Sequence, residues 1–136
     1  MIGRRDVIKA IALASLTWQL ACGGQAPLTE LQRVKSGTLD VVLLSPHDGL
    51  RHGKDTFAIE FRSNGSLMDA GTVRANATMP MPGSPMFGSI DVSRTDVAGR
   101  YTASGQFDMA GTWRLTIDWD GGAAGKGSVT FAGTVQ

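Results

Sequence analysis

The chain has 136 residues, of which 42% are hydrophobic and 18% charged, and it contains 18 glycines. This length suits one globular domain, and the glycine content indicates many turns. The formal net charge is +1. Because residues 1–21 carry a net positive charge, the remainder is nearly neutral and shows no basic stripe. Nucleic-acid binding needs such a stripe, so we expect no nucleic-acid partner. A single cysteine excludes an internal disulfide.

Residues 1–21 are predicted to be a signal peptide. Arg4 and Arg5 form a charged start, and an apolar run follows from Ala10 to Trp18. That run is much shorter than the ~20 residues needed to cross a bilayer, which is typical of a signal peptide. Arg4, Arg5 and Lys9 also fit the pattern of a twin-arginine export signal, although Val7 replaces the usual Phe. The alternative is an ordinary basic start for the general export route.

The predicted signal ends at Cys22. The sequence from Gln19 to Cys22 resembles the lipobox of bacterial lipoproteins, in which the cysteine is acylated and becomes the new N-terminus. Gln19 departs from the motif, which usually has an aliphatic residue at that position. The alternative is an ordinary signal peptide with a cysteine nearby. The resemblance implies a lipid-anchored protein of the bacterial cell envelope, facing the periplasm or the exterior.

Residues 22–37 are predicted to be a flexible linker. Two glycines open this segment and Ser36-Gly37 closes it. Leu28, Leu31 and Val34 have a spacing that favours one or two turns of helix within it. A tether of this kind would hold a lipid-anchored domain away from the membrane surface.

From Thr38 onward, hydrophobic residues recur with a period of two, which predicts strands with one buried face. The clearest runs surround Ile59 and Ile117. Weaker alternation marks five further segments: 38–44, 72–79, 87–93, 99–107 and 127–134. Glycine-containing turns separate these runs. The pattern predicts an all-β domain over residues 38–136, an immunoglobulin-like antiparallel β-sandwich of about seven strands.

A methionine- and proline-rich segment follows one of these predicted strands. Three prolines lie between Met79 and Met86, so the strand must end there in a stiff loop that also carries Met81. Met109 precedes a later strand, and His47 lies in the turn after the first strand. Thioether sulfur prefers Cu(I), and imidazole accepts either oxidation state of copper. If the loops converge, these five residues predict a copper site.

An alternative interpretation of the same residues is structural. Met79 and Met81 share one strand face by parity, and methionine commonly fills gaps in protein cores. Met109, near Trp113, is equally suited to a sulfur–aromatic contact in the core. His47 also has an ordinary structural role available, with its ring bound to backbone or water. No closely spaced pair of cysteines or histidines strengthens the metal interpretation.

The same segments resemble the YtkA-like domain family, which is related to FixH. The resemblance rests on the Met81–Met86 loop, on Gly99-Arg100-Tyr101, on Met109–Trp113, and on Ser45-Pro46 with the Gly53 turn. It extends over residues 38–134. It implies a small extracytoplasmic β-sandwich, and FixH-type members are associated with copper supply to haem–copper oxidases. FixH-type proteins usually have a transmembrane helix, which a lipid anchor on Cys22 would replace here.

Two functions are therefore expected as alternatives. One is a module that holds copper for a membrane-protein partner, and the other is a metal-free interaction domain of the cell envelope. We expect no enzymatic activity. Ser45, His47 and Asp48 are adjacent on a turn and do not form a nucleophile–base arrangement, while Asp118 and Asp120 suit a solvated strand face.

Overall fold

The computed structural model describes residues 27–136, which form nine β-strands and no helix. Signal residues Arg4 and Arg5 and the acylation candidate Cys22 lie outside the described residues. The strands are β1 (Thr29–Ser36), β2 (Leu39–Ser45), β3 (Gly53–Ser63), β4 (Ser66–Leu67), β5 (Gly71–Met79), β6 (Met86–Arg94), β7 (Arg100–Phe107), β8 (Gly111–Gly122) and β9 (Gly125–Val135). Within residues 27–136, no helix has the length and apolar character of a membrane span.

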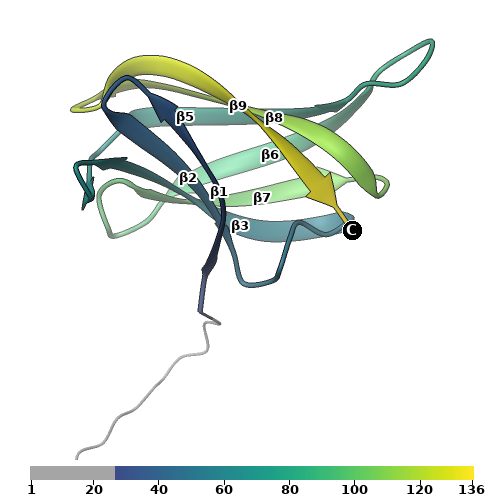
Figure 1. The fold of residues 1–136 in the computed structure, drawn as a ribbon, viewed down its shortest axis with the longest axis horizontal. Helices are drawn as coiled ribbons and strands as arrows, with labels where there is room; N and C mark the ends of the chain where they lie inside the picture. Colours follow the sequence, from purple (N-terminus) through teal and green to yellow (C-terminus); the bar gives the residue numbers. More distant parts are fainter. Residues whose placement is uncertain (1–26) are drawn as a thin grey trace, which may run out of the picture.

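Eight of the strands form one continuous antiparallel sheet in the order β1-β2-β3-β7-β6-β5-β8-β9, and the short β4 pairs with β3. The meander β5-β6-β7 lies between β3 and β8. The sheet folds over so that β1 contacts β9, and the two halves enclose the core (Figure 1). The all-β, antiparallel, sandwich-like class is therefore confirmed. The number of strands is nine rather than about seven, and the two halves are joined through the β6–β7 ladder.

The seven predicted strands correspond to β2, β3 and β5 to β9, and β1 is the main addition. Residues 29–36 pair with β2 along their whole length, so the predicted linker over 22–37 is corrected in this part. The helix-like spacing of Leu31 and Val34 has another cause. A bulge between Glu30 and Gln32 inserts one residue, so both side chains pack against the core although they are three positions apart.

The core contains the inward residues of both halves of the sheet, with aromatic contacts near each end. Phe107 and Trp113 meet edge to face with ring centroids 5.5 Å apart. At the other end, Phe61 packs against Tyr101 at 5.6 Å and against Trp119 at 5.2 Å. Because the alternating hydrophobic residues of β3 and β8 fill this space, the strand register is fixed by burial.

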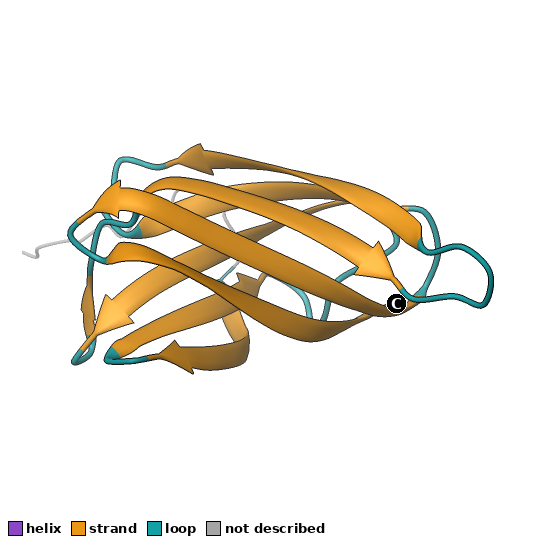
Figure 2. Cartoon of the chain, turned by 90° about the horizontal axis from the view of Figure 1, so that it is seen from above, coloured by secondary structure: helices purple, strands orange, loops and turns teal. Residues whose placement is uncertain are grey.

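The antiparallel pairing sorts the connections into two ends. Segments 46–52, 80–85 and 108–110 lie at one end, called here the loop end, together with the start of β1. Segments 37–38, 64–65, 95–99 and 123–124 lie at the opposite, turn end. The β5–β6 hairpin loop, 80–85, projects furthest from the body at the loop end, as both views show (Figures 1 and 2).

Candidate metal-binding end

Met79 and Met86 form the base of the projecting β5–β6 hairpin. They are register partners, so their side chains point to the same, inner face of the sheet. Met79 is only 7% exposed and belongs to the core, while Met86 is half-buried against it. The core packing that parity allows for Met79 is therefore what the structure shows.

The β7–β8 turn places Met109 close to this base. A Cβ atom added to Gly111 would lie only 2.6 Å from the Met79 Cε atom. The start of β8 therefore packs directly against the Met79 thioether. The Trp113 indole N–H donates a 3.0 Å hydrogen bond to the Met109 carbonyl, which holds the turn. The Met109 side chain itself is 40% exposed. Met79, Met86 and the exposed Met109 therefore all lie on segments at the loop end.

Met81 and His47 occupy different places at this end. Met81 is 39% exposed and lies on the projecting loop beyond Met79. His47 is half-buried in the 46–52 connection, where its backbone N–H donates to the Ser45 hydroxyl at 3.0 Å. The hairpin loop projects away from that connection (Figure 1), so the fold separates His47 from Met81.

Residues 27–136 contain no group of three or more His, Cys, Asp or Glu side chains that could hold a metal ion. Any site at the loop end would therefore depend on thioether ligands. Thioether sulfur is a ligand for Cu(I) and a poor one for hard cations such as Mg²⁺ or Ca²⁺. Met79, Met86 and Met109 each offer a thioether sulfur, the ligand type that suits copper in its reduced state.

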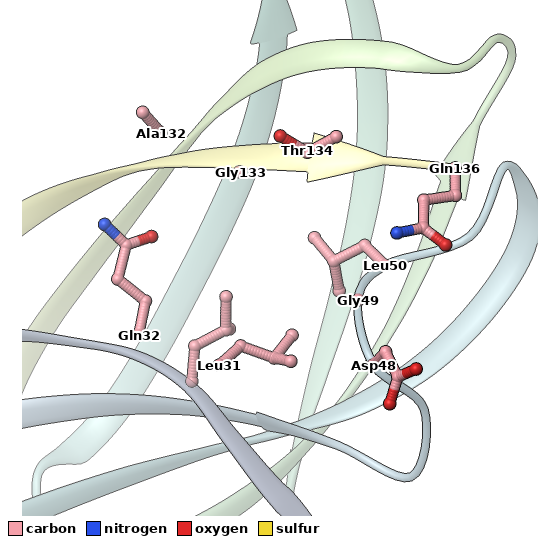
Figure 3. Close-up of a pocket in the computed structure, with 10 residues that line it drawn as sticks. Leu31, Gln32, Asp48, Gly49, Leu50, Ala132, Gly133, Thr134 and Gln136 are labelled. Atoms are coloured by element: carbon pink, nitrogen blue, oxygen red, sulfur yellow. The ribbon is translucent and has the colours of Figure 1, made fainter.

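A small hollow lies at the seam where β1 approaches β9. It has a volume of about 200 Å³, and Leu31, Leu43 and Leu50 are among the residues that line it. Leu31 and Leu50 are labelled in Figure 3. Asp48 and Gln136 lie at its rim. None of the methionines lines it, so this hollow is separate from the thioether group.

A polar cluster at the turn end is built around Asp69. Arg94 contacts both carboxylate oxygens, at 2.9 and 3.0 Å. The Tyr101 hydroxyl lies 3.0 Å from one of these oxygens, and the Gly71 N–H donates to the same oxygen at 3.1 Å. The Gly71 N–H, the Tyr101 hydroxyl and Arg94 together hold the pKa of Asp69 below its ordinary value. These groups lie on four segments, which are the β4–β5 connection, β5, β6 and β7. The cluster therefore fixes the corner between β4 and β5.

A second polar group, buried Glu60, lies on the outer face of β3. Its carboxylate is bound by Arg62 at 2.9 Å and by Arg100 at 2.7 Å. Sequence alternation places Glu60 on an outward face, but it does not show that two arginines cover it so fully that the residue is only 3% exposed. The cross-strand partner that explains this burial is Arg100, forty positions away on β7.

Comparison with known proteins supports the family suggested by the sequence. The YtkA-like family model matches residues 33–118. No curated protein matches the chain. A solved structure with a similar fold is FetP of uropathogenic E. coli strain F11, with a TM-score of 0.50 and 9% sequence identity, covering 79% of this chain and 95% of FetP. At this identity the likeness concerns the fold alone. Since the family model spans more than half of the sequence, this chain belongs to the YtkA-like family.

Proposed function

We propose that the protein is a non-enzymatic, lipid-anchored module of the bacterial cell envelope that holds copper for a membrane-protein partner. The observation that carries the proposal is that Met79 and Met86 are register partners, and that β8, which follows Met109, begins against the Met79 thioether. Copper sites outside the cytoplasm use thioether ligands of this kind. Export is supported by the signal-like residues 1–21 and by Cys22.

The position of each methionine suggests a division of roles. Met109 is 40% exposed and would make the first contact with an incoming ion. Met86 is half-buried and Met79 is almost fully buried, so they would complete the site from below. A site that opens to solvent at Met109 suits an ion that must leave again for a partner. Copper itself would supply no reaction here, because the module is proposed to carry the ion.

The test is a Cu(I) titration of the purified chain in competition with a chromogenic chelator. We expect binding tighter than micromolar in the parent protein. Met86→Leu with Met109→Leu keeps the apolar volume but removes two ligands, and should weaken binding at least tenfold, or ~1.4 kcal/mol. Met68→Leu, at the turn end, is the matched control and should bind as the parent does.

Two results would count against the proposal. Parent binding no tighter than micromolar would remove the copper function and favour the metal-free interaction domain. Equal affinity in the parent and in the Met86 and Met109 double variant would show that copper binds elsewhere. Mass spectrometry of the mature N-terminus tests the anchor separately, because acylation adds a defined mass to Cys22.

A further inference from the structure

The outer end of the β5–β6 hairpin, called here the hairpin tip, consists of loop 80–85 and the two strand pairs below it, Met79–Met86 and Thr78–Phe87. This tip exposes an unusual amount of apolar surface. Phe87 is 68% exposed, more than the other exposed large hydrophobic residues of the described chain, and Met81 is 39% exposed. Residues 75–90 contain no charged side chain at all. A projecting, charge-free segment with an exposed aromatic ring is typical of a contact surface, because isolated soluble surfaces carry interspersed charges.

The exposure of Phe87 is fixed by its neighbours in β6. Met86 and Gly88 face inward, and alternation then forces Phe87 outward opposite Thr78. The register cannot slip to bury the ring. A side chain at Gly88 would meet the Gln106 carbonyl at 2.8 Å and Trp113 at 3.3 Å. The fold therefore holds Phe87 in solvent.

The loop is also stiff. Pro80, Pro82 and Pro85 each restrict the backbone, so the loop loses little conformational freedom when it is immobilised. Because the loop is already rigid, little conformational entropy is lost when its aromatic residue and methionine insert into a membrane or a partner surface. This cost is what usually weakens contacts made by flexible loops.

Unpaired positive charges lie near the apolar tip. Arg114 is exposed beside the hairpin, on the β8 position that pairs with Thr78. Lys54, at the start of β3, is exposed at the same end. Within residues 27–136, no carboxylate forms an ion pair with either of them. The exposed carboxylates at this end are Asp48, Asp108 and Glu30, and Glu30 is paired with Arg33.

We infer that the hairpin tip inserts into the interface of the lipid bilayer, with Phe87 and Met81 among the headgroups and Arg114 and Lys54 on anionic lipids. Apolar residues flanked by cations are the combination that binds membrane surfaces. The inference rests on the proposed anchor. Cys22 precedes Thr29 by seven residues, which span at most ~25 Å, so an acylated chain would keep the domain near the bilayer.

The test attaches the lipid anchor chemically, so its outcome does not depend on whether Cys22 is acylated in the cell. The chain beginning at Cys22 is coupled through that thiol to a maleimide lipid in vesicles of phosphatidylcholine and phosphatidylglycerol. Phe87→Trp reports the tip, and Ala123→Trp, in the β8–β9 turn at the opposite end, is the matched control. The native Trp113 and Trp119 are buried and give a constant background.

We expect the added emission of Phe87→Trp to shift to shorter wavelength and to be quenched by brominated lipid, whereas that of Ala123→Trp should do neither. Emission from Phe87→Trp that stays as in water would overturn the inference. So would a shift seen only in native membranes and not in pure lipid, because that result would assign the tip to a protein partner.

The copper proposal can fail independently. Phe87→Ser, measured without the tether, should lower vesicle binding severalfold and leave Cu(I) affinity unchanged. The Met86 and Met109 double variant should do the reverse. A joint loss in both variants would contradict the separation of the two surfaces.

Discussion

Gly122 shows how a single residue secures the turn end of the sheet. A Cβ atom at this position would lie 2.4 Å from the Asp69 carbonyl oxygen and 2.5 Å from the Gly71 nitrogen. Both neighbours are backbone atoms, so no side-chain rotation can relieve the clash. We expect Gly122→Ala to lower the free energy of unfolding by about 1–3 kcal/mol, the usual cost of overpacking.

The measurement is urea unfolding followed by tryptophan fluorescence. Gly133→Ala is the matched control, because its Cβ would meet only Leu50 and Leu115 side chains at ordinary distances of 3.5 and 3.6 Å. That variant should unfold within about 0.5 kcal/mol of the parent or be slightly more stable. Equal midpoints for the two variants would show that the backbone at Gly122 moves freely.

At the level of single residues, the sequence predicts burial better than it predicts partners. Side-chain alternation along the strand correctly predicts that Met79 faces inward, and the alternation around Ile117 correctly predicts which face of β8 is buried. Parity carries no information on which strands become neighbours. The contact of the Met79 thioether with Gly111 depends on the β5–β8 pairing, and the Glu60–Arg100 contact depends on the β3–β7 pairing. The first joins residues 32 positions apart and the second joins residues 40 positions apart.

At the level of elements, β1 illustrates a failure with a physical cause. Pattern reading assumes an unbroken period, and the bulge at Leu31 shifts it by one residue. The segment also lies at an edge and is half exposed, so its hydrophobic signal is weak. Strands paired on both sides, such as β3 and β8, carry long alternating runs because burial demands them.

The corner between β4 and β5 depends on ionised Asp69. In the folded state the Gly71 N–H, the Tyr101 hydroxyl and Arg94 lower the pKa of Asp69 below its ordinary value of 3.8. A carboxyl with a lowered pKa in the folded state stabilises the fold above the unfolded pKa. That stability disappears as the pH falls from about 4 through the folded pKa. The corner should therefore loosen in acid.

We expect Asp69→Asn to be less stable than the parent at neutral pH and to lose less additional stability as the pH falls. The check is chemical unfolding of both proteins from neutral pH to about pH 2, compared as a difference at each pH. Glu30 and Asp40 also have lowered pKa values, but they are present in both proteins and cancel in the comparison. A difference that stays constant with pH would show that the charge on Asp69 does not stabilise the corner.

At the level of the whole molecule, the folded-over sheet separates a rigid body from its two edges. Strands β2, β3, β7, β6, β5 and β8 each pair on both sides. Strand β9 pairs with β8 and, near its end, with Leu50 through a single bridge. Strand β1 pairs with β2 and contacts β9 across the seam that holds the small hollow. The loops that carry the methionines therefore extend from the rigid part.

This arrangement predicts an order of amide hydrogen exchange. Amides of β3 and β8 should exchange slowest, because releasing them requires global unfolding. Amides of β1 should exchange fastest among the strands, since opening β1 breaks one ladder and exposes only half-buried side chains such as Leu31 and Val34. Exchange measured by NMR or mass spectrometry, at two pH values to confirm rapid reclosing, gives the opening free energy of each strand. If β1 were protected as strongly as β3, β1 would open only when the whole core unfolds. That result would mean that backbone hydrogen bonds, and not side-chain contacts alone, join β1 to β9.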